Sequence, residues 1–239
     1  MSIWITGDTH NGARNPVFKD GRNDMSKLVE LASRDSAERP GDGDFLIIVG
    51  DAFGVDPTNE PEWLEWLNAQ SWTTLFIEGN HENYDVLGRL PTIAMFGDEV
   101  GKMSERVFHL RRGHVYLIEG LRFFAFGGAE SADKATRFSG IDWWPEEVPS
   151  TREVYEAFDQ LAEHNNTVDV VLTHAAPRSQ IDNVSFGGKS IKITDPTCDA
   201  LQTFFDELTF TRWFCGHYHI DEVSGKLRFL YQDVVRLTL

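Results

Sequence analysis

The sequence is poor in cysteine and has no long hydrophobic run. Its two cysteines, Cys198 and Cys215, are too few for the disulfide framework of a small secreted domain. The apolar stretch 45–49 (FLIIV) is typical of its longest, far below the roughly 20 residues that span a bilayer. The opening MSIWITGDTH lacks the basic stretch followed by an apolar one that marks a signal peptide. We therefore expect a cytoplasmic protein without membrane association, in which Cys215 is a buried thiol.

Positive charge is also scarce, because 22 lysines and arginines stand against 38 aspartates and glutamates, for a formal net charge of -16. A binder of long nucleic acids needs a cationic surface, so this class of protein is disfavoured. A small anionic substrate remains compatible if cations in the site reverse the local field. The 239 residues are 41% hydrophobic and show no internal repeat or obvious linker, which predicts a single domain over residues 1–239.

The first half of the chain alternates short apolar runs with amphipathic segments, as βαβ units do. Strands are expected at 2–6, 45–49 and 73–78, and helices at 25–34 and 61–70. The run 45–49 is apolar throughout, which indicates a strand buried on both faces.

The second half predicts more strands and two more helices. Three antiparallel strands are expected within 107–110, 114–120 and 122–128, followed by a long segment without periodicity to residue 149. Loops this long are usually functional or disordered. Ser150 and Glu153 have capping-box spacing at the start of a helix that runs to about residue 164.

The C-terminal part continues the alternation. A buried strand is expected at 168–173, and a helix follows with Asp195 as its N-cap and Pro196 at its first position. The closing strands are expected within 212–215, 219–225, 227–232 and 234–239.

Side chains of the kind that bind metals follow five of the expected strands. The seven candidates are Asp8, His10, Asp51, Asn80, His174, His217 and His219. Each group alone is common in turns, but ligands in open α/β sheets bind outside the carboxyl ends of strands. Five such groups in succession therefore favour one shared site. Three other histidines, His109, His114 and His164, lie outside this pattern and are expected to be ordinary ones.

A glycine immediately precedes four of these groups, at positions 7, 50, 79 and 216. A residue without Cβ lets the backbone turn sharply and bring the next side chain inward. Alternation along an extended backbone would then place His217 and His219 on one side and Tyr218 on the other. Both rings are therefore expected to reach one cleft.

The candidate set exceeds the four ligands of a tetrahedral zinc ion and suits two metals that share a bridging carboxylate. Imidazole and carboxylate ligands without thiolate favour manganese, which we expect first, or iron, zinc, cobalt or nickel. Two such ions about 3.5–4 Å apart can clamp the attacking and departing oxygens of a phosphoryl displacement. They also lower the pKa of a bound water towards about 7.

With these motifs the chain resembles the calcineurin-like metallophosphoesterases. The blocks D-x-H, G-D, G-N-H-[ED], H and G-H-x-H of that family occur in order at 8–10, 50–51, 79–82, 174 and 216–219. The resemblance implies an α/β fold, a four-layer α/β/β/α sandwich in which two facing mixed β-sheets are flanked by helices.

The resemblance also implies roles for individual residues. One metal would be held by Asp8, His10, Asp51 and His219, and the other by Asp51, Asn80, His174 and His217. Asp51 would bridge the two ions, and a hydroxide between them would attack phosphorus in line. His81 would lie beside Asn80 at the substrate and protonate or polarise the leaving oxygen, so that His81 and Asp51 are the expected catalytic residues. The alternative for His81 is a histidine packed at the start of a helix.

The second block departs from the family pattern. Many members continue it as G-D-x-x-D-R with an arginine that supports the phosphate, whereas this chain has Phe53 and Gly54 in GDAFGVDP. The contact with phosphate must then come from elsewhere or be absent. Candidates for substrate binding are Arg14, Lys134 and Arg137, and the alternative for each is a solvated surface charge.

We expect a phosphatase or phosphodiesterase that acts on a small phosphorylated substrate or a phosphoprotein. Two alternatives stay open. A catalytically idle binding scaffold usually loses a ligand or the histidine of the third block, but here every position is filled. A nuclease would use the same metal chemistry, and a local basic groove would escape the average charge of the chain.

Overall fold

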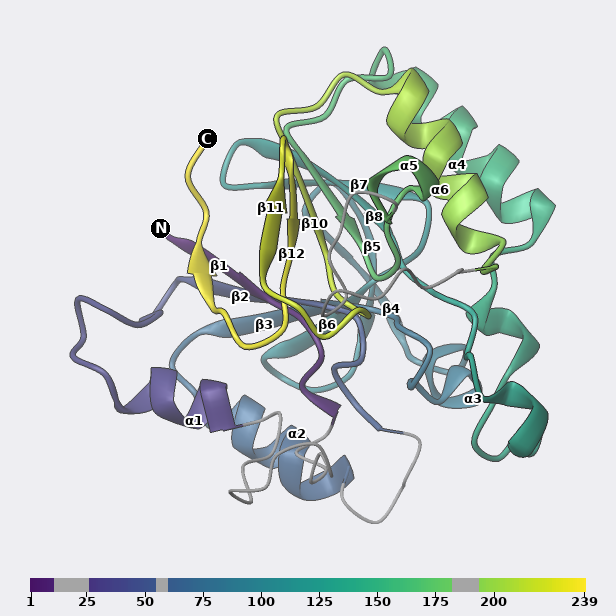
Figure 1. The fold of residues 1–239 in the computed structure, drawn as a ribbon. Coiled ribbons are helices and arrows are strands. Elements are labelled where there is room, and N and C mark those ends of the chain that lie inside the picture. Colours follow the sequence, from purple (N-terminus) through teal and green to yellow (C-terminus); the bar gives the residue numbers. More distant parts are fainter. Residues whose placement is uncertain (11–25, 55–59, 182–193) are drawn as a thin grey trace.

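The computed structural model describes residues 1–10, 26–54, 60–181 and 194–239 (Figure 1). Its strands are β1 (Ile3–Thr6), β2 (Phe45–Val49), β3 (Thr73–Ile77), β4 (Thr92–Met95), β5 (Asp98–Lys102), β6 (Val107–Leu110), β7 (His114–Ile118), β8 (Leu121–Phe126), β9 (Val170–Thr173), β10 (Arg212–Cys215), β11 (Glu222–Ser224), β12 (Leu227–Phe229) and β13 (Val235–Arg236). Its helices are α1 (Ser26–Ser33), α2 (Glu60–Asn68), α3 (Tyr84–Leu87), α4 (Thr151–Glu163), α5 (Arg178–Ile181) and α6 (Thr197–Glu207), with 3-10 turns η2 (Lys134–Thr136) and η3 (Pro145–Glu147).

The strands form two mixed sheets. The seven-stranded sheet has the order β13-β1-β2-β3-β6-β5-β4, and the six-stranded sheet has the order β11-β12-β10-β9-β8-β7. Strands β1, β2, β3 and β6 are parallel neighbours in the first sheet. Strands β8, β9, β10 and β12 are parallel neighbours in the second. Parallel strands are buried on both faces, which explains their nearly continuous apolar sequences.

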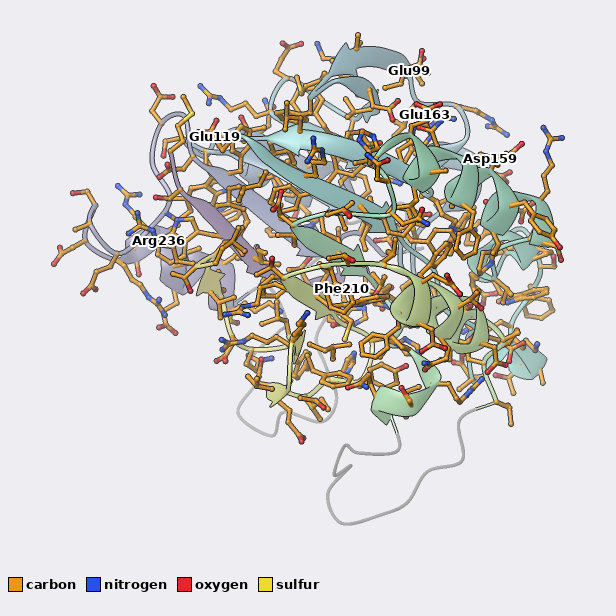
Figure 2. The ribbon with its side chains drawn as sticks, turned by 90° about the horizontal axis from the view of Figure 1, so that it is seen from above. Glu99, Glu119, Asp159, Glu163, Phe210 and Arg236 are labelled. Atoms are coloured by element: carbon orange, nitrogen blue, oxygen red, sulfur yellow. The ribbon has the colours of Figure 1, made fainter. Side chains whose placement is uncertain are left out.

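Three hydrophobic clusters hold four layers together. Between the sheets, side chains such as Ile47 and Phe123 form the central core. On the outer face of the seven-stranded sheet, α1 and α2 contribute buried residues such as Leu28 and Trp63. On the outer face of the six-stranded sheet, α4 and α6 contribute residues such as Phe204 (Figure 2). The expected α/β/β/α sandwich is confirmed.

Other local expectations can be compared with the structure. Both cysteines, Cys198 and Cys215, are buried thiols. Among the helices of the described residues, none has the length and apolar character needed to cross a bilayer. The capping box of α4 is confirmed, because the Glu153 N–H donates to Ser150 Oγ at 3.2 Å and the Ser150 N–H donates to Glu153 Oε2 at 2.7 Å.

Helix α6 begins one residue later than expected, at Thr197, with Pro196 as the N-cap residue. The predicted capping group is nevertheless in use. The Asp195 carboxylate accepts a hydrogen bond of 2.7 Å from the Thr197 N–H. The Asp195 carboxylate, one residue before the N-cap, thus still accepts a hydrogen bond from a backbone N–H of the first turn that has no partner within the helix.

The middle of the chain differs from the expected antiparallel run. Strands β7 and β8 are an antiparallel pair in the six-stranded sheet, but β6 belongs to the seven-stranded sheet and pairs with β3 and β5. The chain crosses between the sheets at 111–113, where Gly113 has a φ of 85°. Arg112 fixes this crossing, because its Nε lies 2.8 Å from Glu78 and its Nη1 lies 3.0 Å from Glu153 of α4.

The hairpin of β4 and β5 was not expected from the sequence. Its two connecting residues, Phe96 and Gly97, both have positive φ, of 58° and 84°. Two-residue hairpin turns favour such angles, but asparagine, aspartate or glycine is the usual residue at the first position. Because phenylalanine is unusual at this position, the sequence did not predict the turn.

Candidate metal centre

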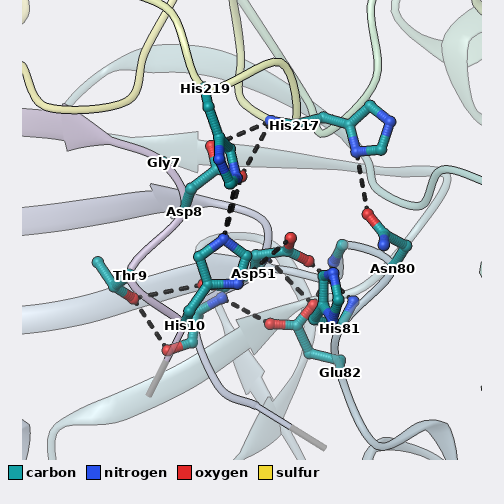
Figure 3. A network of polar contacts seen from close by, with 12 residues as sticks. Gly7, Asp8, Thr9, His10, Asp51, Asn80, His81, Glu82, His217 and His219 are labelled. Carbon is teal, nitrogen blue, oxygen red and sulfur yellow. Dashed lines mark hydrogen bonds and ion pairs between the residues drawn. The ribbon is translucent and has the colours of Figure 1, made fainter. Parts of the chain in front are cut away.

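The seven predicted ligands converge where parallel strands of the two sheets end (Figures 1 and 3). They follow β1, β2 and β3 of one sheet and β9 and β10 of the other. Backbone hydrogen bonds fasten the first block to the second, because the N–H groups of Thr9 and His10 both donate to the Asp51 carbonyl, at 2.9 and 2.8 Å. Residues far apart in sequence are therefore held in one fixed frame.

A first group of ligand atoms surrounds His10. Its Nε2 atom lies 3.1 Å from His219 Nε2 and 3.8 Å from Asp8 Oδ1, and His219 Nε2 lies 3.6 Å from Asp8 Oδ1. Two ligand atoms bound to one tetrahedral zinc at about 2.0–2.1 Å are roughly 3.3 Å apart. These three residues could therefore hold one ion with modest adjustment.

A second group surrounds the amide oxygen of Asn80. His217 Nδ1 lies 2.9 Å from this oxygen, and His174 Nε2 lies 3.2 Å from it. The Asn80 amide nitrogen donates to Ser131 Oγ at 3.1 Å, which directs the oxygen towards the two imidazoles. This arrangement presents a carbonyl oxygen and two imidazole nitrogens to a common point.

Asp51 connects the two groups. Its Oδ1 atom lies 3.4 Å from His174 Nε2, whereas its Oδ2 atom lies 3.7 Å from His10 Nδ1. The side chain is almost fully buried, with a relative exposure of 1%. One carboxylate thus has one oxygen on each side of the centre.

Five of the seven ligand residues have left-handed backbone angles. The φ values are 53° for Asp8, 44° for His10, 50° for Asp51, 69° for His217 and 51° for His219. Positive φ is uncommon for residues with a side chain and is found preferentially at functional sites. The expectation of an extended backbone at 217–219 is wrong, because the two rings reach the centre through successive left-handed bends.

The preceding glycines have a different role from the expected one. Only Gly50 of the four has a positive φ, of 84°. A Cβ at Gly79 would collide with the Asp51 carboxylate and with His174. At Gly50, Gly79 and Gly216 ligand side chains pack directly against the backbone, whereas Gly7 is packed against backbone atoms of Leu230 and Gly216 and against Val49. The sharp turn usually falls on the ligand residue itself.

The buried charges of the centre depend on one another. Burial opposes a charge on His174, but the neighbouring carboxylates of Asp51 and Asp8 outweigh it and raise the pKa of His174 to about 10. Burial likewise opposes the charge of Asp51, but the histidines around it hold its pKa well below the usual value. Burial and the charge on His174 lower the pKa of His217 to about 3. The free centre thus keeps a proton where a metal cation would be accommodated.

His81 lies at the rim of the centre. Its backbone N–H donates to Asp51 Oδ1 at 2.9 Å, and its ring meets the ring of His10 edge to face at 5.2 Å. Arg137 reaches it from the long segment after β8, with guanidinium nitrogens 3.4 and 3.5 Å from the two ring nitrogens. Burial lowers the pKa of His81, and the neighbouring His10 and Arg137 lower it further, against the opposing effect of Asp51.

The three basic residues that were predicted to bind phosphate differ in their surroundings. The side chain of Arg137 is 14% exposed, and its Nε pairs with Asp133 at 2.8 Å while Nη1 donates to the Asp142 carbonyl at 3.1 Å. Lys134 is paired with Glu130 and is about half exposed, so it lies on the surface. Arg14 lies outside the described residues. The structure brings Arg137 to His81.

Two supporting residues were missed from the sequence. The Glu82 carboxylate accepts backbone N–H groups from Ala52 at 2.6 Å, Phe53 at 3.1 Å and Gly79, which locks the second block onto the third. Burial and the nearby Asp51 raise the pKa of Glu82 to about 8. The signal for Glu82 was its place in the third block, whereas Ser131 lies in a segment without any motif.

The three histidines outside the pattern occupy other places. His109 lies 2.8 Å from Glu78, and His114 lies 2.9 Å from Asp98. His164 is the C-cap residue of α4. Phe53 of the second block is 1% exposed and packs on Phe76 with ring centroids 5.1 Å apart, so it belongs to the core.

Comparison with known proteins gives one family. The sequence model of the calcineurin-like phosphoesterase family matches residues 1–221. No curated protein sequence matches the chain. Among solved structures, phosphopantetheinyl hydrolase (PptH) from Mycobacterium tuberculosis is 16% identical, with 95% of this chain and 87% of that chain covered and a TM-score of 0.48. The protein of unknown function AQ665 from Aquifex aeolicus is 16% identical, with 73% and 80% covered and a TM-score of 0.35.

Proposed function

The chain belongs to the calcineurin-like phosphoesterase family, and we propose that it hydrolyses phosphate esters with the help of two divalent transition-metal ions. The observation that carries this proposal is the position of Asp51. Its two carboxylate oxygens face His10 on one side and His174 on the other. A buried carboxylate shared by two sets of ligands is what a dinuclear centre requires.

The chemistry of the donors fits the proposed ions. One ion would be held by Asp8, His10, Asp51 and His219, and the other by Asp51, Asn80, His174 and His217. The set combines imidazole nitrogens with carboxylate and amide oxygens and contains no thiolate, which suits manganese first, or iron, zinc, cobalt or nickel. When bound, two such ions lower the pKa of a coordinated water and neutralise charge on the phosphoryl oxygens.

His81 is proposed to assist the leaving group. Its ring lies at the rim, beside His10 and Arg137, and its backbone is fixed by Asp51. Its lowered pKa makes the free imidazole mostly neutral near pH 7, and a neutral ring can still donate one hydrogen bond. A bound phosphate adds negative charge and raises this pKa, so that the ring can also donate a proton.

Arg137 is proposed to replace the arginine that the second block lacks. It comes from the long segment after β8, and its guanidinium already lies beside the ring that would face the substrate. A planar guanidinium can bind two phosphate oxygens at once. The substrate is proposed to be a small phosphorylated molecule or a phosphoprotein, consistent with the net charge of -16.

The metal content of purified protein tests the centre. We expect close to two transition-metal ions per chain, and loss of most of both ions in Asp51→Asn. The matched control is Asp42→Asn, because the side chain of Asp42 is 91% exposed. Full retention of both ions by Asp51→Asn would overturn the bridging assignment.

Activity tests the reaction separately. Metal-stripped protein with manganese added back is compared on a phosphomonoester, a cyclic dinucleotide and single-stranded DNA. Turnover of a small ester supports the proposal, whereas preference for DNA would favour the nuclease alternative. Two bound metals with no turnover of any phosphate ester would favour the idle scaffold.

A further inference from the structure

A small cavity lies between the edges of the two sheets, on the side of β10 opposite to the candidate metal centre. Its volume is about 270 Å³, and strands β10, β11, β12 and β13 contribute its walls. Arg212 opens β10 at this cavity, whereas the metal-site histidines follow the carboxyl end of the same strand. The floor is apolar and includes the buried side chain of Phe214 and the half-buried side chain of Val235, which packs against the same core.

The rim of the cavity is cationic. Four of its lining residues carry positive charge, and none of the described residues that line it is acidic; the four are Arg212, Lys226, Arg228 and Arg236. The chain as a whole has 38 acidic residues and 22 basic ones. A group of four basic residues without an acidic one is therefore not what its average composition would produce. Figure 2 marks the position of Arg236 on the seven-stranded sheet.

The strand register places like charges next to each other. In the parallel pair of β10 and β12, Trp213 lies opposite Leu227 and Phe214 lies opposite Arg228. Strand alternation puts Arg212 on the same face as Phe214 and therefore on the same face as Arg228 of the neighbouring strand. Like charges that are neighbours on one face of a sheet repel each other, and an anion bound between Arg212 and Arg228 would offset this cost.

The neighbouring protein groups compensate only part of this charge. Among the described residues, Arg228 has one ion pair, with Asp233 at 2.8 Å. The other three donate to neutral oxygens: Arg212 to the Thr211 carbonyl, Lys226 to the Phe210 carbonyl and Arg236 to Ser2 Oγ. The cavity thus retains an excess of positive charge above an apolar floor.

We propose that this cavity binds a small organic anion. A carboxylate, sulfonate or phosphate group would lie between Arg212 and Arg228, and the apolar body of the ligand would pack on Phe214 and Val235. Guanidinium groups suit such oxyanions because they bind two oxygens with parallel hydrogen bonds. A volume of about 270 Å³ is at the lower end for ligand sites, which limits the ligand to about one or two rings or a short acyl chain.

Calorimetric titration of the purified full chain with naphthalene-1-sulfonate tests the site. The neutral analogue naphthalene-1-methanol, of similar size, reports the contribution of the apolar floor alone. We expect the sulfonate to bind more tightly than the alcohol, with an affinity that falls as salt is raised. Removing one guanidinium should weaken sulfonate binding by about tenfold, so Arg212→Gln and Arg228→Gln are measured singly and together. Arg152→Gln is the matched control, because Arg152 is an exposed arginine on α4.

Amide chemical-shift mapping on the wild-type chain locates the ligand if a variant does not fold. Shifts confined to 212–214 and 226–236 support the cavity. Shifts at 217–219 and 8–10 would place the anion at the metal centre and overturn the proposal. Equal affinity for the sulfonate and the alcohol, or no effect of the two substitutions, would overturn it as well. The test does not depend on phosphoesterase activity.

Discussion

The phenol ring of Tyr231 lies flat on the imidazole of His219, with centroids 4.4 Å apart and planes inclined by 1°. The carbonyl of Tyr231 accepts a hydrogen bond from Lys27 of α1, whose buried ammonium also donates to the carbonyls of Gly7 and Asp8. One lysine side chain thus joins the backbone around Asp8 to the residue that supports His219.

Replacing Lys27 should therefore disturb one half of the centre. We expect Lys27→Met to lose the ion assigned to Asp8, His10 and His219 while the second ion is retained, because the carbonyls of Gly7, Asp8 and Tyr231 that this ammonium binds all lie beside the first group of ligands. Metal content per chain after dialysis measures this. Tyr231→Leu keeps the carbonyl, removes the stacked ring and should have a weaker effect in the same direction.

The control for Lys27→Met is Lys102→Met, because Lys102 is a partly exposed lysine paired with Glu105. It should retain both ions. Equal loss of the two ions from Lys27→Met would indicate general destabilisation and would contradict a role confined to one half of the centre.

His81→Ala should separate chemistry from metal binding. Both ions should be retained, and kcat for an ester with a poor leaving group should fall by roughly 10²–10⁴-fold, the usual contribution of general acid–base catalysis. A p-nitrophenyl ester should be less affected, because its leaving group needs little protonation. His164→Ala, at the C-cap of α4, is the control. Unchanged turnover of the poor-leaving-group ester would remove His81 from the mechanism.

Arg137→Gln should reduce kcat/KM by about 10- to 100-fold, the value of one charge-assisted hydrogen bond to phosphate. Its neighbour Lys134 is the matched control, since it is paired with Glu130 at the surface, and Lys134→Gln should change kcat/KM less than twofold. If Arg137 only positions His81, the double variant with His81→Ala will be no slower than His81→Ala alone. Equal effects of the two cation substitutions would contradict the assignment.

Glu78 should make stability depend on acid pH. Its burial opposes ionisation, but Arg112 and then His109 hold its pKa at about 2, below the ordinary glutamate value of 4.5. The carboxylate therefore stabilises the fold above pH 4.5, and this contribution, about 3 kcal/mol, is lost as the pH falls towards 2. Urea unfolding of metal-stripped protein should show that Glu78→Gln is strongly destabilised at pH 7 and less so near pH 3.

The stripped protein is needed because acid also releases metals, which would alter the free energy of unfolding. Glu105→Gln is the control, since Glu105 is 80% exposed and its pair with Lys102 should contribute little. A destabilisation by Glu78→Gln that is the same at pH 7 and pH 3 would contradict the lowered pKa.

The alternating strands and helices and the convergence of the ligands were predictable from strong local signals, whereas the four layers were implied by the resemblance to the family. Continuous apolar runs such as 45–49 predict buried parallel strands, and parallel strands bring their carboxyl ends to one edge. The capping box at Ser150 and Glu153 is equally local. Each of these signals lies within a few residues, so no knowledge of the rest of the fold is needed.

The remaining features depend on contacts between distant segments. The place of β6 in one sheet and β7 in the other is fixed by Arg112, which pairs with Glu78 and Glu153 from separate elements. The left-handed angles at His217 and His219 are imposed by a frame that the local sequence does not describe. Ser131 and Lys27 support the ligands from segments without a motif, so sequence patterns could not single them out.

The ligands that face each other at the centre lie at opposite ends of the chain, and His10 and His219 are separated by 209 residues. At a synthesis rate of about 5–20 residues per second, the first would wait roughly 10–40 s for the second to be made. The centre can therefore be completed only after His219 has been made. A ribosome that stops before β10 releases a chain with five of the seven metal ligands, which lacks His217 and His219.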